Sequence, residues 1–246
     1  FVLGIKAETE SEGLPWSEIV RLRLFAKGFQ LPFYLKIGGV EAISDIDMAH
    51  NINVDSLIAP MVESAFGASK FLAATDPLSN DGLDRRLLIE SEMGLASLEK
   101  ILIFAGEAIQ GVNFGRSDLS TSMSMGRPDL LRQDSKMVSA ELSRALRIAK
   151  KSGLETTMGG GISYQSLLDI VENFSVLPDR IETRRFIFCT EKVARKPEVL
   201  NEILSIELEM MADLVARNNS AALRWSIYAG QLQSRLDRGR PDIFSG

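Results

Sequence analysis

The sequence is poor in the residues that most often mark disulfide, thiol or histidine chemistry. Its 246 residues include one cysteine, Cys189, and one histidine, His50. A single cysteine excludes an internal disulfide and favours a reducing, cytoplasmic location. Cys189 ends the apolar run Phe186-Ile-Phe-Cys189, which favours core packing over a reactive thiol. His50 falls on a predicted helix, away from the strand ends considered below, so we do not expect it to act as the catalytic base.

Long apolar runs and an excess of positive charge are also missing. No run approaches the roughly 20 residues of a membrane span, so we expect no membrane partner. The net charge of −5 argues against nucleic acid as a partner. No Gly-x-Gly-x-x-Gly motif follows the first predicted strand, and the alternative of an open nucleotide-binding sheet therefore lacks support. With 45% hydrophobic residues, the chain can bury one large core, and we treat residues 1–246 as a single domain.

Short apolar runs alternate along the chain with stretches of helical spacing, which predicts an α/β fold with a parallel sheet. Seven strands are expected, at residues 2–7, 32–37, 56–61, 87–90, 111–115, 155–158 and 180–189. The segment 197–236 is helical in pattern, and a polar loop is expected from Ser120 to Arg127. A closed barrel of this type needs eight strands. We therefore expect that a first strand lies upstream of Phe1 or is absent from this chain.

Two neighbouring predicted strands each end in a carboxylate, Glu90 in the first and Asp118 after the second. The helical pattern between them makes a strand–helix–strand unit, whose right-handed crossover places the two strand ends side by side. Two carboxylates that converge there repel each other unless a cation lies between them, and hard oxygen ligands suit Mg²⁺ or Mn²⁺. The alternative is local: Asp118 precedes Leu-Ser-Thr and fits an Asx-turn.

The motifs around these carboxylates resemble those of the HpcH/HpaI aldolase and citrate lyase β-subunit family. In that family a strand ending in Ile-Glu-Thr is followed by Gly-x-Asp-Leu-Ser at the next strand. Here the motifs read Ile89-Glu-Ser91 and Gly115-Arg-Ser-Asp-Leu-Ser120, and Ile58-Ala-Pro-Met-Val-Glu-Ser64 resembles the family's Pro-Met-Val upstream. The resemblance covers residues 30–125 well. It implies a TIM (β/α)8 barrel with extra C-terminal helices and magnesium-assisted enolate chemistry on a pyruvate-like 2-oxo acid.

The resemblance also implies roles for residues at the other strand ends. Lys36 stands where the family has an arginine that contacts the keto oxygen; it keeps the charge but loses the planar fork. A Schiff-base role for Lys36 is a further option. Glu8, Glu10 and Glu12 lie in a loop where the family carries acidic residues and often a histidine, and one of the three is expected to hold metal-bound water or to act as the base. A charge run of this kind is also typical of a solvated loop.

Substrate binding is expected at the turn after the second central strand. There Gly115 and the backbone amides of Ser117 and Asp118 would hold a carboxylate. Arg116 and Arg184 are candidates for further anion recognition, and Arg184 could instead be structural, paired with Glu182. The glycine triplet at residues 159–161 permits close approach of the backbone to a ligand.

These observations predict a metal-dependent carbon–carbon lyase of the aldolase type, which binds Mg²⁺ or Mn²⁺ through Glu90 and Asp118 and acts on a small 2-oxo acid. The alternative is a catalytically divergent barrel that binds a small carboxylic acid or serves as a pathway scaffold. The family's histidine and arginine are missing, and Leu88 stands where some members of the family have a glutamine. The segment 197–236 carries more apolar surface than one barrel helix needs. The family often exchanges its C-terminal helices between subunits, so a homo-oligomer is expected.

Overall fold

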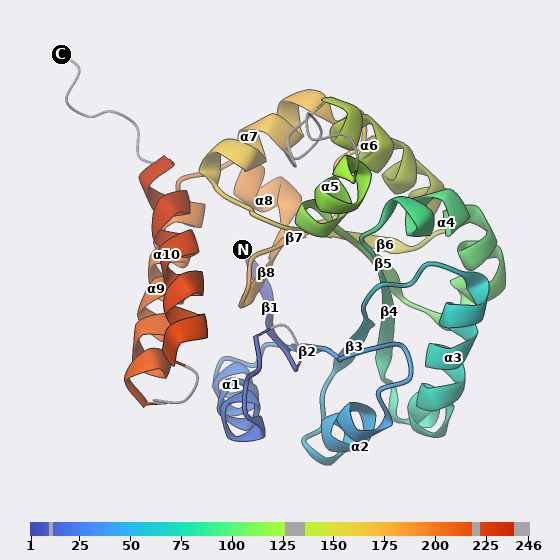
Figure 1. Ribbon diagram of the computed structural model, residues 1–246, viewed down its shortest axis with the longest axis horizontal. Helices are drawn as coiled ribbons and strands as arrows, with labels where there is room; N and C mark the ends of the chain where they lie inside the picture. The colour runs from blue at the N-terminus through green and yellow to red at the C-terminus, as the bar shows by residue number, and fades with distance from the viewer. Residues whose placement is uncertain (10–11, 126–135, 218–221, 239–246) are drawn as a thin grey trace.

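The computed structural model describes residues 1–9, 12–125, 136–217 and 222–238. Eight strands in this part of the chain form a closed barrel in sequence order (Figure 1). They are β1 (Val2–Glu8), β2 (Phe33–Lys36), β3 (Ser56–Ala59), β4 (Asp84–Ile89), β5 (Gly111–Gly115), β6 (Glu155–Gly159), β7 (Arg180–Glu182) and β8 (Phe186–Cys189). The predicted barrel fold is confirmed, and these strands close it without a further one.

The predicted single strand at residues 180–189 is wrong, because this stretch folds into β7 and β8. A turn at residues 183–185 reverses the chain, and the Thr183 N–H donates to the Phe186 carbonyl at 2.9 Å. Strand β8 therefore runs antiparallel to both β7 and β1, while every other neighbouring pair is parallel. The sequence-based count gave seven strands because it treated β7 and β8 as one, and the expectation of a missing first strand followed from that count.

A ring of helices surrounds the barrel (Figure 1). It comprises α1 (Trp16–Gly28), α2 (Ile43–Asn51), α3 (Ala65–Thr75), α4 (Glu92–Ala105), α5 (Arg116–Ser124), α6 (Lys136–Lys151), α7 (Tyr164–Asn173) and α8 (Thr190–Ala194), with short 3₁₀ turns η1 (Asp76–Asp81) and η2 (Gly106–Ala108). Helix α5 replaces the start of the loop predicted from Ser120. Leu119 and Met123, four residues apart, are both buried, which anchors one face of α5 on the core.

The large apolar core lies between the strands and this ring, and the inside of the barrel holds polar groups around a small apolar cluster of Tyr34, Ile58, Leu88 and Ile187. Along each strand, side chains alternate between the two sides. In β2, for example, Phe33 and Leu35 join the large core cluster, whereas Tyr34 belongs to a small cluster inside the barrel. The parallel strands pair so that Leu88 of β4 stands beside Asn113 of β5, and Asn113 beside Thr157 of β6. The inward-facing residues therefore lie in layers.

The lower lumen, defined as Tyr34, Arg86, Glu155, Thr157 and Arg180, is a network of polar groups in which Glu155 and Arg180 are partly exposed and the other three are buried. Arg86 bonds with Glu155 and also donates to Asp84 at 2.8 Å. Arg180 donates to the Tyr34 hydroxyl and pairs with Glu155, both at 2.6 Å. A Cβ at Gly111 would lie 2.5 Å from Arg86 Nη1, so the glycine makes room for the guanidinium. This network closes the barrel below the candidate site.

Helices α9 (Val199–Arg217) and α10 (Ala222–Arg238) pack against each other beside the barrel (Figure 1). Helix α9 faces α1 and buries Leu200, Ile203, Leu204, Met211 and Leu214. Its fully buried Glu207 accepts hydrogen bonds from Thr183 Oγ1 and from the Arg185 N–H at 2.6 Å. The apolar face of α9 is therefore buried within a single chain, so its apolar residues give no reason to expect exchange of helices between subunits. The homo-oligomer stays a prediction.

No helix in the described ranges is both long and apolar enough to cross a membrane.

Candidate active site

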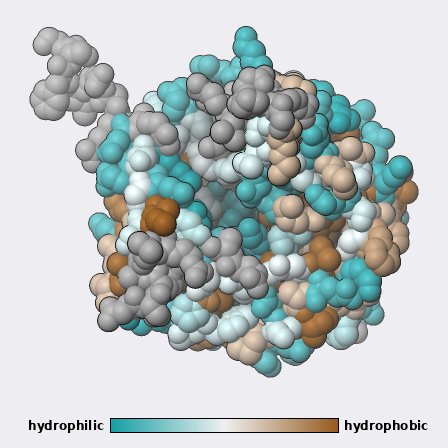
Figure 2. Space-filling view, in the orientation of Figure 1, coloured by the Kyte–Doolittle hydropathy of each residue, from teal (hydrophilic) through white to brown (hydrophobic). Residues whose placement is uncertain are grey.

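A cavity of about 620 Å³ opens where β1, β2, β4, β5, β6 and β7 end. Figure 2 shows hydrophilic surface in the hollow at the centre of the barrel. The lining residues are Lys6, Glu8, Lys36, Leu88, Glu90, Gly115, Ser117, Asp118, Gly159, Gly160, Gly161, Ile162, Glu182, Thr183, Arg184, Tyr228, Gln231, Ser234 and Arg235. The cavity therefore lies at the end of the barrel where enzymes of this fold carry their sites.

Glu90 follows β4 directly and is 4% exposed. The next residue, Ser91, caps α4 by accepting the Gly94 N–H at 3.0 Å, which ends the strand at this point. The Met61 N–H donates to Glu90 Oε1 at 3.1 Å. A Cβ at Gly115 would lie 2.9 Å from Glu90 Cβ and Oε2, so only glycine leaves room for this carboxylate.

Asp118 lies in the first turn of α5 and reaches Glu90, with which it shares a side-chain hydrogen bond. Burial raises the pKa of Glu90 to about 7, and the Asp118 charge and this hydrogen bond raise it too, against the opposing effects of Lys36 and the Met61 N–H. The structure thus brings together the two carboxylates that the sequence placed at neighbouring strand ends. Bringing the Asp118 charge and the Glu90 carboxyl together in a buried place therefore disfavours ionisation of Glu90.

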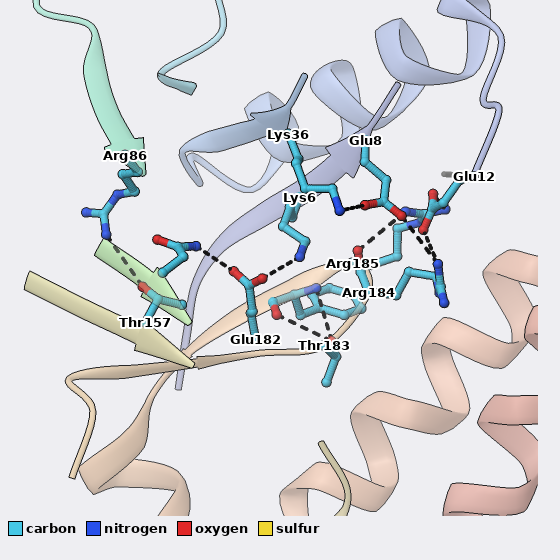
Figure 3. A network of polar contacts seen from close by, with 12 residues as sticks. Lys6, Glu8, Glu12, Lys36, Arg86, Thr157, Glu182, Thr183, Arg184 and Arg185 are labelled. Atoms are coloured by element: carbon cyan, nitrogen blue, oxygen red, sulfur yellow. Dashed lines mark hydrogen bonds and ion pairs between the residues drawn. The ribbon is translucent and has the colours of Figure 1, made fainter. Parts of the chain in front are cut away.

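Lys36 ends β2 and extends into the same cavity, where its Nζ lies 2.9 Å from Glu8 Oε2 (Figure 3). Burial alone would lower the pKa of Lys36, but attraction by Glu8, Glu90 and Glu182 and the hydrogen bond to Glu8 outweigh it and raise that pKa. The ammonium form is therefore the stable one, which argues against a Schiff-base role.

A second buried pair, Lys6 and Glu182, was not predicted as part of the site. Lys6 Nζ lies 2.5 Å from Glu182 Oε1, and Asn113 Nδ2 donates to Glu182 Oε2 at 3.1 Å (Figure 3). A Cβ at Gly159 would lie 2.9 Å from Glu182 Cγ and Oε1. The signal in the sequence was parity: Lys6 is two residues before Glu8 and therefore points to the same side of β1.

Arg184, in the turn between β7 and β8, also lines the cavity. Its Nη1 donates to Glu12 at 2.9 Å and to Glu8 at 3.4 Å (Figure 3). Its guanidinium carbon lies 4.0 Å from the centre of the Tyr228 ring. The suggested pairing of Arg184 with Glu182 is therefore wrong, since Lys6 holds Glu182.

Glu12 is fully buried and bound to two arginines, with Arg185 Nη2 2.5 Å from its Oε2. It does not line the cavity. A carboxylate locked in this way positions Arg184 and is poorly placed to accept a proton from a ligand. Glu10, the other expected base, lies outside the described residues.

Among the expected substrate-binding residues, Gly115, Ser117 and Asp118 line the cavity, whereas Arg116 does not. Arg116 is 2% exposed and is not among the lining residues, so the cavity gives no support to its predicted role in anion recognition, which stays a prediction. Gly160 has a φ of +89°, and a Cβ there would lie 2.6 Å from the Ser117 nitrogen. Only glycine allows the two backbones to come this close.

Helix α10 contributes four cavity residues that sequence reasoning missed. Tyr228, Gln231, Ser234 and Arg235 recur at spacings of three and four, so they share one face of the helix. Leu232 and Leu236 are buried. Helix α10 therefore covers the cavity with a polar face. The apolar residues of the segment 197–236 did not predict this face.

His50 and Cys189 do not line the cavity, as expected.

The donor set can be tested against a divalent cation. Glu90 and Asp118 offer carboxylate oxygens side by side, and a cation between them would replace the shared proton. Across the described part of the chain, no group of three or more His, Cys, Asp or Glu residues is gathered as a metal site. Mg²⁺ commonly uses one or two carboxylates and takes its other ligands from water and substrate. The residues present fit that mode of binding.

Comparison with solved structures identifies proteins that share this fold. An HpcH/HpaI aldolase/citrate lyase family protein from Burkholderia cenocepacia J2315 matches with a TM-score of 0.58 and 16% identity over 80% of this chain and 84% of the other. The HpcH/HpaI aldolase from Desulfitobacterium hafniense DCB-2 matches with a TM-score of 0.56 and 17% identity over 82% of each chain. The chain has the fold of these aldolase structures.

Citrate synthase SbnG is similar too, with a TM-score of 0.57 and 13% identity over 80% of this chain and 81% of the other. No protein-family model matches the sequence, and no curated protein does. At these identities the likeness concerns the fold, so the function has to be argued from the site itself.

Proposed function

We propose that this protein is an aldolase-type carbon–carbon lyase that uses Mg²⁺ or Mn²⁺, held by Glu90 and Asp118, to stabilise the enolate of a small 2-oxo acid. One observation carries the proposal: two carboxylates share a hydrogen bond at the open end of the barrel, beside a lysine held in its charged form. The shared fold with HpcH/HpaI aldolases supports the same reading. The 2-oxo acid follows from the motif resemblance.

The chain's own residues would divide the work as follows. Glu90 and Asp118 hold the cation, which supplies Lewis-acid polarisation of the bound oxygens when present. The backbone amides of Ser117 and Asp118, at the start of α5, bind the substrate carboxylate. Lys36 directs its positive charge toward the oxygen on which enolate charge develops, with Glu8 fixing the position of the ammonium group. Helix α10 limits access of water to the bound acid.

Oxaloacetate provides a direct test, because loss of CO₂ from it forms the pyruvate enolate. The wild-type protein should decarboxylate oxaloacetate faster than solution only when Mg²⁺ or Mn²⁺ is added. Glu90→Gln keeps the shape of the side chain but removes the charge, and it should lower this activity by at least about 100-fold. Lys36→Met should also lower it, whereas Lys36→Arg should retain part of the activity.

The matched control is Glu41→Gln, which changes an exposed carboxylate paired with Lys70. It should behave like the wild type. Isothermal titration should detect Mg²⁺ binding to the wild type and not to Glu90→Gln. A wild-type protein that binds the cation and pyruvate but never forms the enolate would instead be the small-acid-binding barrel.

A further inference from the structure

The proposed reaction needs a group that takes up and returns a proton. None of the residues given a role above fills this function. No histidine lines the cavity among the described residues. Glu90 and Asp118 are committed to the cation, Glu8 is bound to Lys36 and Arg184, and Glu12 lies outside the cavity between two arginines. The cavity contains one more described carboxylate, that of Glu182.

Glu182, at the end of β7, is held in position by residues of three other strands. Lys6 of β1 and Asn113 of β5 each hold one of its oxygens, at 2.5 Å and 3.1 Å. On β6, Gly159 leaves the space that the carboxylate occupies. Figure 3 shows the Lys6 ammonium group pointing toward the Glu182 carboxylate, with Lys36 and Glu8 beyond Lys6. A carboxylate needs this kind of support if it is to act as a base in one fixed orientation.

Lys6 is 9% exposed and also lines the cavity. Within the described residues, its ammonium group donates to Glu182 alone. Because an ammonium group carries several N–H donors, the remaining ones can reach an oxygen of a bound ligand. A buried lysine that holds a carboxylate on one side and opens to a cavity on the other is a costly arrangement for structure alone.

We propose that Glu182 is the residue that accepts and returns the proton in this cavity, with Lys6 and Asn113 as its positioning residues. This inference rests on the proposed function. In cleavage, the Glu182 carboxylate takes the proton of the substrate hydroxyl as the neighbouring carbon–carbon bond breaks. The hydroxyl carbon becomes a carbonyl, and the electron pair of the broken bond becomes the enolate. The protonated Glu182 then gives its proton to the enolate carbon, so no other reactant is consumed.

Two reactions of simple acids separate this role from enolate stabilisation. Exchange of the methyl protons of pyruvate in D₂O requires a base to remove a proton from carbon. Decarboxylation of oxaloacetate forms the same enolate by breaking a carbon–carbon bond, with no proton to remove. If the inference holds, both reactions need Glu90 and Lys36, but only the exchange of the pyruvate methyl protons needs Glu182.

The experiment measures both rates for the wild type and for Glu182→Gln with added Mg²⁺, by proton NMR and by loss of oxaloacetate absorbance. Glu182→Gln should lose pyruvate exchange by at least about 100-fold and keep decarboxylation within about threefold of the wild type. Asn113→Ala removes one positioning hydrogen bond without touching the carboxylate, and it should lower exchange by about tenfold. Glu41→Gln is again the matched control, and circular dichroism checks the fold of every variant.

If Glu182→Gln exchanges the methyl protons of pyruvate at the wild-type rate, the inference is overturned and the proposed function still stands. An equal loss of exchange and decarboxylation also overturns it, because Glu182 would then support the site without moving a proton. If Glu182→Gln does not fold, Asn113→Ala decides by the same ratio of the two rates. A wild-type protein that neither decarboxylates nor exchanges overturns the proposed function, and this inference with it.

Discussion

The lower lumen and the cavity above it lie in the same barrel, and both are lined by buried charges, but the charges are arranged differently. In the lower lumen each charge faces an opposite one: Arg86 bonds with Asp84 and Glu155, and Arg180 with Glu155. In the cavity, Glu90 faces another carboxylate, Asp118, and its pKa rises to about 7. The cavity therefore contains a repulsion between two carboxylates that does not help to stabilise the fold.

The contrast helps to separate structural from functional charge. A closed network of opposite charges is stable without any ligand, and its loss is felt as unfolding. Like charges held side by side at the open end of a barrel are stabilised only by a proton or a cation, and such sites are where function is usually found. Changes in the lower lumen should therefore alter stability, whereas changes in the cavity should alter chemistry.

Arg86→Leu should have the largest effect on stability. It removes the buried guanidinium that Asp84 and Glu155 share; Glu155 keeps Arg180, but Asp84 loses its ion-pair partner, which should lower the free energy of unfolding by about 3 kcal/mol. Urea unfolding followed by circular dichroism measures it. The control Arg144→Leu removes an exposed pair with Glu141 and should change stability by less than about 0.5 kcal/mol. Equal effects of the two changes would contradict the contrast.

The pH dependence of stability should identify the repulsion at Glu90. Its pKa rises from an ordinary 4.5 to about 7 in the folded protein, so the folded state binds the proton more tightly. This contribution to stability is complete below about pH 4.5 and is lost as the pH rises through about 7. Without metal, Glu90→Gln should therefore be more stable than the wild type at pH 8, by about 2–3 kcal/mol.

Added Mg²⁺ should stabilise the wild type above pH 7 and leave Glu90→Gln unchanged, because only the wild type retains the site. Thermal unfolding at pH 5 and pH 8, with and without the cation, gives all the comparisons. If Glu90→Gln and the wild type keep the same difference in melting temperature at both pH values, the two carboxylates do not repel each other as described.

The alternation of strands and helices predicted the α/β fold and the Glu90–Asp118 pair from local patterns, and the motif resemblance implied the barrel. The strand–helix–strand unit fixes which strand ends meet, and the motifs mark the acids. The turn at residues 183–185 was missed because apolar residues on both sides make 180–189 look like one strand. The signal was there in the three polar residues Thr183, Arg184 and Arg185, which interrupt the run.

The remaining cavity residues could not be predicted, because they depend on contacts between distant parts of the chain. Lys6 and Glu182 are 176 residues apart and meet only because the barrel closes. The polar face of α10 reaches the cavity because α9 packs on the barrel and α10 packs on α9. Arg116 was predicted to bind substrate from its place in a motif, but it is buried and does not line the cavity.

The glycines of the cavity offer a milder perturbation than removal of a charge. A Cβ at Gly115 would lie 2.9 Å from Glu90 Oε2, whereas nothing lies within 4 Å of a Cβ at Gly39. Gly115→Ala should displace the Glu90 carboxylate and lower Mg²⁺-dependent oxaloacetate decarboxylation by about tenfold, equivalent to about 1.4 kcal/mol. Gly39→Ala should leave the rate unchanged. Equal rates for the two variants would mean that the position of Glu90 is not limiting.

The smallest expected effect is at the boundary between the barrel and α10. The Arg184 guanidinium lies over the Tyr228 ring, and its Nη1 is also bound by Glu12 and Glu8. A contact of this type is worth about 0.5–1 kcal/mol at a partly exposed site. Tyr228→Leu should therefore loosen one edge of the cavity and raise the KM for oxaloacetate about two- to fivefold at constant kcat. Leu is apolar and keeps the helix intact, so the effect reports on the ring. A fall in kcat without a change in KM would instead mean that Tyr228 takes part in the chemical step and not only in binding.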